Sequence, residues 1–406
     1  MEPMEPMEPT EPRGPHAVDV LPGIDAIPDA LWRRLAPADD PLWSRAVFAA
    51  MERGSIGPDG YAYLVVRRAS RPVAVLPLCL FGGLRLDRIV GPRERRLLAP
   101  AARRLPRLLR LPTLFCGHLL GQGHILGPER GDPEVGRLLV AAVLEFARAR
   151  RLRTVVFKDF AAAELAPLGA ALRQAGFLVL PSLPDTELRL PYRSFDDYLA
   201  ALPAKPRRNA RSKIRKFAGR PGLRMEVLES FTHLVPQILA LYRQVMDRAD
   251  QTLDEIDAAF LTALRPEGGL RTRLVACFEG DRLVAFLLCL FHGAGATGTR
   301  IGLDYALAHD ARLYHNVHYA AIRLALRAGC RHIRFAQTAY TPKVEFGCDL
   351  IEQHHAITHL RPLPRALLRR FLPPALARAR ADALGPHGPA EPRPPHQESR
   401  QDPCPE

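Results

Sequence analysis

Apolar residues recur along this chain in two arrangements, short leucine- and valine-rich runs and longer segments with helical spacing. Residues 61–81 and 274–291 each contain an apolar run, a short polar turn and a second apolar run, and both segments end in Leu-Cys-Leu-Phe. Strands joined by a tight turn produce this pattern. The pattern therefore predicts one β-hairpin in each half of the chain.

Each hairpin is followed, farther along, by an amphipathic helix that leads into a short strand. The expected helix and strand span residues 135–151 and 153–157 in the first half, and residues 313–329 and 331–335 in the second. A repeated order of elements indicates an internal duplication. We interpret the chain as two divergent copies of one unit, with the boundary within residues 184–194 and an α/β (α+β) fold class.

The two ends of the chain have a different composition. Met-Glu-Pro repeats open it, and residues 385–406 are rich in Pro and polar residues, so both ends are expected to be disordered. The expected organisation is a tail over 1–16, a first domain over 17–185, a second domain over 186–362, a helical segment over 363–384 and a tail over 385–406. Within that helical segment, residues 364–372 alternate Arg with Leu and are expected to end at Pro373-Pro374, docked on the domain. The alternative is a helix on an anionic membrane surface.

Charge and cysteine content narrow the function classes. Lys and Arg total 57 against 43 Asp and Glu, a net charge of +14, which favours anionic partners in general. The seven cysteines form no Cys-x-x-Cys pair and no regular framework, which favours reduced thiols. Apolar runs are too short to span a bilayer and no signal sequence opens the chain, so we expect a cytoplasmic protein that does not bind DNA.

Residues 206–217 form the most basic segment and read as a helix with Pro at its first turn. Six of these twelve residues are cationic and none is acidic. One interpretation is an anion clamp, because guanidinium groups match phosphate oxygens in pairs. The candidate substrate-binding residues are then Arg207, Arg208, Arg211 and Lys213. The other interpretation is a solvated amphipathic helix.

Lysine is rare in this chain, with five in all, and one of them follows the predicted strand 331–335. Lys343 is a candidate to neutralise a phosphate or to stabilise a negative tetrahedral intermediate. Tyr340 is a candidate general acid, or alternatively an aromatic residue that covers the strand end. Gln337 would orient a substrate amide. The histidines of residues 354–359 fit a strand better than a His-Glu-x-x-His helix, so we expect no metal site.

Residues 194–202, 206–216 and 329–348 together resemble the GNAT acyltransferases, in the branch that includes CelD-like acetyltransferases and is related to FemABX peptidyltransferases. In that branch a short arginine-rich helix precedes the domain, and a Tyr-x-x-Lys-x-x-x-Gly stretch follows the strand after the main helix. Tyr340, Lys343 and Gly347 match that stretch. The resemblance covers about residues 194–360 and is only architectural for about residues 17–185. It implies two tandem GNAT-like mixed-sheet domains with flanking helices.

Many GNAT enzymes hold coenzyme A with an Arg/Gln-x-x-Gly-x-Gly/Ala loop before the main helix, and residues 306–315 lack those glycines. Asp310 is expected to cap the helix and to compete for its amides. The remaining donor-binding candidates are Arg312, Tyr314 and Asn316. The first copy has Asp132, Pro133 and Glu134 at its helix start, so a phosphorylated donor is expected in the second copy only.

The resemblance implies an acyltransferase that uses acetyl-CoA or another acyl-CoA and no metal. The acceptor is expected to be an amine or hydroxyl of a cell-envelope or polysaccharide-related molecule, whether small molecule, glycan or peptide, bound between the copies. The alternatives are a FemABX-like aminoacyl transfer from charged tRNA and a GNAT-shaped scaffold without catalysis.

Overall fold

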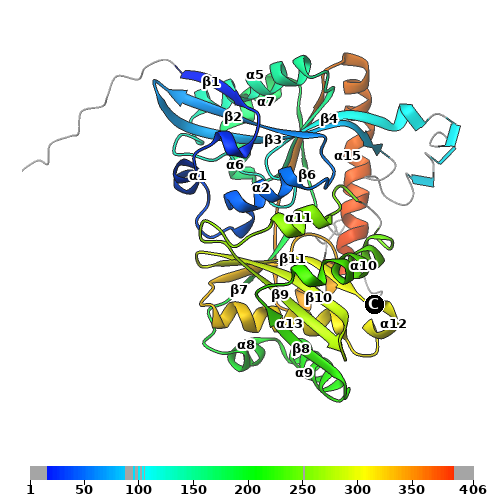
Figure 1. The fold of residues 1–406 in the computed structure, drawn as a ribbon. Coiled ribbons are helices and arrows are strands. Elements are labelled where there is room, and N and C mark those ends of the chain that lie inside the picture. Colours follow the sequence, from blue (N-terminus) through cyan, green and yellow to red (C-terminus); the bar gives the residue numbers. More distant parts are fainter. Residues whose placement is uncertain are drawn as a thin grey trace, which may run out of the picture.

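The computed structural model describes residues 16–86, 95–96, 99–100, 103–104, 106–249 and 252–387. Two mixed sheets of seven strands each form the centres of two units, which lie one above the other in Figure 1. Both tail predictions fall largely outside the described residues. Residues Gly385–His387, expected in the second tail, form a short 3-10 helix.

The first sheet has its strands in the order β1 (His16–Leu21), β2 (Gly60–Arg68), β3 (Arg71–Arg85), β4 (Arg110–Cys116), β5 (Thr154–Phe160), β14 (His354–His359) and β6 (Leu178–Pro181). Its helices are α1 (Asp29–Leu35), α2 (Arg45–Arg53), α5 (Pro133–Ala149), α6 (Ala162–Leu165) and α7 (Gly169–Gln174), with a 3-10 turn η2 at Pro41–Trp43.

The second sheet has the order β8 (Leu223–Leu228), β9 (Arg271–Glu279), β10 (Arg282–His292), β11 (Gly295–Leu303), β12 (His332–Arg334), β7 (Asp185–Arg189) and β13 (Asp349–Ile351). Its helices are α8 (Phe195–Ala201), α9 (Ala204–Ala218), α10 (Val235–Met246), α11 (Ala258–Ala263), α12 (Tyr305–Ala308), α13 (Leu313–Arg327) and α14 (Tyr340–Glu345).

Both sheets have the same pattern of strand directions. Neighbouring strands are antiparallel throughout, except for one parallel pair in each sheet, β4 with β5 and β11 with β12. Phe157 pairs with Ala356, and the amide of Phe335 donates to the carbonyl of Thr186, so the two phenylalanines stand at equivalent points. The duplication and the two hairpins predicted from the sequence are confirmed.

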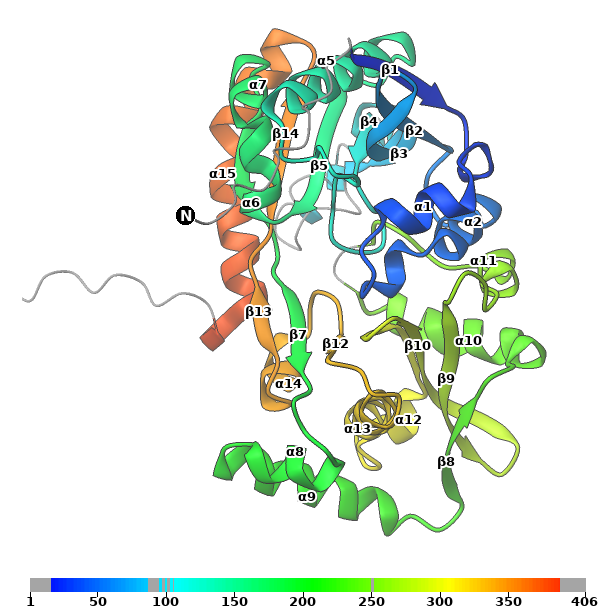
Figure 2. The ribbon, with the colours of Figure 1, turned by 90° about the vertical axis from the view of Figure 1, so that its left-hand side faces the viewer.

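The two units exchange one strand each, which the sequence did not predict. β14 comes from the end of the expected second domain, 186–362, yet it lies between β5 and β6 of the first sheet. β7 stands at the boundary and takes the equivalent place in the second sheet, between β12 and β13. Figure 2 shows β14 running into the upper sheet and β7 into the lower one. The first sheet therefore combines β1 to β6 with the distant β14, whereas the second sheet is built from β7 to β13, which follow one another in the chain.

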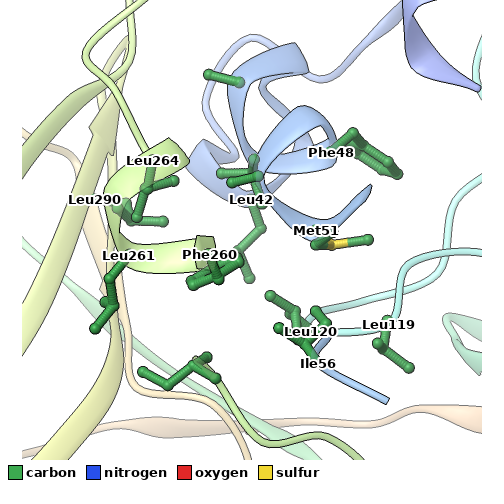
Figure 3. Close-up of a cluster of buried hydrophobic side chains, with 14 of the residues drawn as sticks. Leu42, Phe48, Met51, Ile56, Leu119, Leu120, Phe260, Leu261, Leu264 and Leu290 are labelled. Atoms are coloured by element: carbon green, nitrogen blue, oxygen red, sulfur yellow. The ribbon is translucent and has the colours of Figure 1, made fainter. Parts of the chain in front are cut away.

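An apolar core joins the two units. Phe260, Leu261 and Leu264 of α11 lie against Leu42 and the helix α2 of the first unit, and one continuous cluster of buried residues includes side chains from both sheets (Figure 3). Each sheet buries its other face separately, the first under α5 and the second under α13. The molecule is thus layered as helix, sheet, shared core, sheet and helix.

The last helix, α15 (Pro362–Leu384), is longer than residues 364–372 and passes through Pro373 and Pro374, which were expected to end it. Its side chains Leu368, Leu372 and Leu376 pack against the shared core. This packing offsets the backbone hydrogen bonds that the two prolines remove. None of the described helices is long and apolar enough to cross a membrane.

The shared core predicts that the two units unfold together. Phe260 is 2% exposed at the junction, so Phe260→Ala should lower the free energy of unfolding by about 3–5 kcal/mol while keeping a single transition. Leu139→Ala, in the outer core of the first unit, is the control and should also shift one common transition. Two separate heat-absorption peaks by calorimetry, with only one moved by each variant, would contradict the shared core.

Candidate functional site

The main helix of the second unit, α13, begins without a side-chain cap. Arg312 occupies its N-cap position with a left-handed backbone, φ 55°, and makes no side-chain cap hydrogen bond. The expectation that Asp310 caps this helix is wrong. Its carboxylate lies instead on the surface, 4.0 Å from Arg220 Nη2, because residues 305–308 first form the separate helix α12, capped by Asp304. The first-turn amides of α13 are left open to an anion.

The equivalent helix of the first unit, α5, is closed. Asp132 Oδ1 accepts a hydrogen bond from the amide of Glu134 at 2.8 Å, and Pro133 at the first position has no amide to offer. Asp132 is therefore the N-cap of α5, at the helix start where the sequence has two acids and a proline. Of the two main helices, only α13 has a free amino end.

The basic helix α9 packs beside the start of α13. Lys213 Nζ donates to His315 Nε2 at 2.8 Å and to Glu345 Oε2 at 2.6 Å. Burial, followed by the charge of Lys213, lowers the pKa of His315 to about 4, so its ring is neutral at pH 7. Asn316 Nδ2 donates to the carbonyls of Lys213 and Arg312, at 3.2 and 3.0 Å. Lys213 and Asn316 thus fix α9 against α13.

The remaining cations of α9 divide into two groups. Arg207 donates to the carbonyl of Ala200 at 2.7 Å and so ties α9 to α8. Arg208, Arg211 and Arg215 are exposed, while Ala210 is buried. The helix is therefore docked by one face and presents a cationic stripe to solvent, close to the open end of α13.

The parallel strands β11 and β12 stay paired over three residues only. Their last paired residues are Thr297 and Arg334. The register of β10 and β11 shifts here, because Cys289 pairs with Gly298 and Leu288 with Arg300, which leaves Thr299 as a bulge outside the ladder. The ring of Phe335 lies against Gly298, where an added Cβ would be 2.9 Å from Phe335 Cδ1. Phe335 thus fills the space beside the bulge.

The loop that follows β12 is held by Lys343. Three of its residues, Ala336, Thr338 and Ala339, have left-handed backbones. Lys343 Nζ donates to the carbonyls of Ala336 at 2.9 Å and Gln337 at 2.8 Å. Burial lowers the pKa of Lys343, and the nearby Asp185 opposes this shift. Lys343 is 4% exposed, so its contacts are those of a residue that positions the loop.

Tyr340 and Gln337 also make protein contacts. The Tyr340 hydroxyl donates to the carbonyl of Pro184 at 2.8 Å and is buried. Gln337 Nε2 donates to the carbonyl of Leu183 at 2.9 Å and to Gln353 Oε1 at 3.0 Å. These contacts fix the crossing of the exchanged strands, and the catalytic and substrate-binding roles of the two residues stay predictions.

Seven of the sequence-predicted residues therefore form two groups, linked by α14, while Arg207, Arg208 and Arg211 of α9 belong to neither. Arg312, Tyr314, Asn316 and Lys213 gather at the start of α13, while Tyr340, Lys343 and Gln337 gather at the strand crossing. Glu345 and Lys343, both on α14, contact one group each. The ring of Tyr314 stacks at 6.4 Å on Phe346, directly after that helix.

Sequence analysis missed a set of charged residues on the face of the second sheet that looks toward the first unit. Arg334 Nη1 lies 3.0 Å from Asp40 Oδ2, and its Nε lies 2.9 Å from Glu187 Oε2. Arg300, beside the bulge, pairs with Asp254. The partners Asp40 and Arg334 are 294 positions apart, so no local pattern could have indicated this contact. Thr297, paired with Arg334 in the ladder, has a buried hydroxyl for which the described residues provide no partner.

The expected strand over the histidine-rich segment is confirmed as β14. His355 Nδ1 accepts from the amide of Asp159 at 3.2 Å. Among the described residues, no group of His, Cys, Asp and Glu side chains has the arrangement of a metal site.

Comparison with known proteins finds a family match within the second unit. Residues 204–343 match the family described as the acetyltransferase (GNAT) domain. No curated protein matches the chain. Similar solved structures include the C-terminal domain of a putative lysylphosphatidylglycerol synthetase from Agrobacterium fabrum (TM-score 0.49, 12% identity, covering 85% of this chain and 92% of that one). FemX is also similar (TM-score 0.49, 11% identity, covering 83% of this chain and 95% of that one). So is a tandem GNAT protein from the clavulanic acid biosynthesis pathway (TM-score 0.47, 14% identity, covering 85% of this chain and 99% of that one).

Buried neutral histidines predict acid sensitivity. Burial lowers the pKa of His118 and His318 to about 3, whereas an unfolded histidine titrates near pH 6.5. Below pH 6.5 the unfolded chain takes up protons that the folded protein does not, so stability is complete above pH 6.5 and is lost as the pH falls. We expect a loss of about 2 kcal/mol for each of the two histidines between pH 6.5 and 5. The melting temperature of His318→Phe should depend less on pH than that of the wild type. The control His309→Phe, at an exposed site, should show the wild-type pH dependence. An equal change of melting temperature with pH in all three proteins would refute the assignment.

The contacts of Lys343 and Tyr340 predict a stability defect. Lys343→Met removes the donor of two partly buried carbonyls and one of the two cations, with Arg334, that act on the buried Asp185, so we expect a loss of about 3 kcal/mol in the free energy of unfolding. Tyr340→Phe removes one hydrogen bond and should cost about 1 kcal/mol. Denaturant unfolding with the exposed-lysine control Lys216→Met would measure both. If both variants are as stable as the wild type, the contacts of Lys343 and Tyr340 do not stabilise the fold, and only their predicted catalytic roles remain.

Proposed function

Because residues 204–343 form an acetyltransferase (GNAT) domain, we propose that the protein transfers an acyl group from acyl-CoA, with acetyl-CoA as the first donor to test. The observation that carries this proposal is the open amino end of α13, set beside the bulged and separating strands β11 and β12. The acceptor would be an amine or hydroxyl of a cell-envelope or polysaccharide-related molecule.

The donor would bind with its phosphates at α13. Free amides at a helix start and the positive end of the helix dipole favour phosphate, and Arg312 supplies a guanidinium at the same point. The exposed cations of α9, Arg208 and Arg211, would add long-range attraction for the polyanionic donor. In the first unit the cap of α5 leaves no such place, so one donor site per chain is proposed.

The acyl carbonyl would lie at the bulge in β11. A bulge leaves a residue outside the ladder, here Thr299, and a backbone amide without a ladder partner can stabilise the oxyanion that forms when the acceptor attacks. Phe335 would have to turn away from Gly298 to admit the thioester. A rotation of this ring is therefore part of the proposed donor binding.

The acceptor would approach from the face of the second sheet that carries Arg334. Two carboxylates, Asp40 and Glu187, hold this one guanidinium, and Asp185 lies nearby as a third acid. Because Lys343 also lies near Asp185, three carboxylates stand against two cations, and this excess of one negative charge favours a cationic amine over an anionic acceptor. The six described cysteines are all free thiols, in keeping with the cytoplasm as the proposed location.

Calorimetric titration of the purified protein with acetyl-CoA, a longer acyl-CoA and charged tRNA, in parallel, tests the donor. We expect acyl-CoA to bind, and Arg312→Gln to weaken it about tenfold, because one charge-assisted contact to phosphate is lost. The matched control is Arg137→Gln in the first turn of the capped helix α5, which should bind normally. Binding of charged tRNA alone would favour aminoacyl transfer, and no binding of any donor would favour a scaffold without catalysis.

A further inference from the structure

The outer face of α15 carries large apolar side chains that nothing in the described structure covers. Leu363, Leu367 and Phe371 are 71%, 51% and 62% exposed. The other exposed large apolar residues of the described chain, Val20, Val179, Val227 and Tyr305, stand singly on different elements. Single exposed apolar residues are normal on protein surfaces, but a contiguous group marks an interaction site.

The three side chains form one stripe, separate from the face that docks the helix. Successive residues of an α-helix are rotated by about 100° around its axis, so residues four apart lie nearly in line. Leu363, Leu367 and Phe371 therefore span an arc of about 80°. The docking face formed by Leu368, Leu372 and Leu376 is centred about 140° away around the axis. The helix therefore has two apolar faces, and only one of them is used inside the molecule.

The stripe belongs to a segment whose charged residues are all positive. Residues 361–381 contain six arginines and no acidic residue. By the same rotation Arg370 and Arg378, both exposed, fall on the side of the stripe, and the guanidinium of Arg370 lies 5.9 Å from the Phe371 ring. Arg369 falls on the docked side, where its Nη2 donates to the carbonyl of Gly176 at 3.5 Å. Farther along, Arg380 is turned to the protein, where it contacts Glu352 and the carbonyl of Ser182.

We propose that the outer face of α15 docks the protein onto an anionic lipid bilayer. An apolar stripe with adjoining arginines and no acids is the arrangement by which a helix lies in a membrane interface. Leucine and phenylalanine enter the region below the headgroups while the arginines contact lipid phosphates. α15 lies along the outside of the molecule in Figures 1 and 2, so a flat surface can reach it. This inference does not depend on the proposed donor.

Vesicle flotation of the full chain tests the proposal. The protein should float with vesicles of phosphatidylcholine and phosphatidylglycerol. With vesicles of phosphatidylcholine alone, it should remain in the bottom fraction of the gradient. The triple variant Leu363→Ser, Leu367→Ser, Phe371→Ser should lose most of the binding at unchanged melting temperature, because its side chains are exposed. The control Val20→Ser, Val227→Ser removes exposed apolar side chains elsewhere and should bind as wild type.

A fluorescence measurement identifies which face enters the lipid. The two natural tryptophans, Trp32 and Trp43, are at most 1% exposed and give a constant background. Phe371→Trp should shift its emission to shorter wavelength when anionic vesicles are added, whereas Val227→Trp should not. Wild-type flotation by the triple variant, or no shift at position 371, would overturn the proposal. A dimer of the free protein that the triple variant converts to monomer, without vesicle binding, would assign the stripe to a second copy instead.

Discussion

The reciprocal exchange of β7 and β14 is the constraint on which the rest of the structure depends. Each strand lies second from the edge in the sheet of the other unit, so removing either strand would break two ladders. The exchange also forces the chain to cross between the sheets twice. At this crossing the protein concentrates its buried polar contacts, including those of Lys343, Tyr340 and Gln337. Backbone groups there have left the ladders, and side chains must satisfy them.

The crossing also fixes the geometry around the candidate site. β7 is a neighbour of β12 and supplies Glu187 to Arg334, while the η2 segment of the first unit supplies Asp40 to the same guanidinium. The face of the second sheet beside the bulge is thus built from both units. A fragment cut to the residues that match the GNAT family, 204–343, would lack β7, and with it one wall of the proposed acceptor site.

Local features of the fold could be predicted from the sequence, and nonlocal ones could not. The hairpins and the two helix-strand units follow from apolar spacing over a few residues, which is why 61–81 and 274–291 were recognised. The exchanged strands β7 (DTELR) and β14 (HHAITH) contain few apolar residues, so their spacing does not reveal their partners. Asp310 was expected to cap the main helix, and the separate helix α12, which Asp304 caps, was not expected before it. The pairs Arg334 with Asp40 and Arg300 with Asp254 were unpredictable for the same nonlocal reason.

The two copies differ most where the proposed chemistry needs them to differ. Two independent features close the first copy, the carboxylate of Asp132 on the amide of Glu134 and the missing amide of Pro133. Removing the carboxylate alone would leave a helix start with one donor too few, so a single substitution would not restore an anion site there. The second copy has neither feature, and the left-handed Arg312 stands at the position where the first has its acid. After the duplication, therefore, only the second unit has an open start to its main helix. The first unit contributes the partner strands of β14, part of the shared core, and Asp40, which pairs with Arg334 on the second sheet.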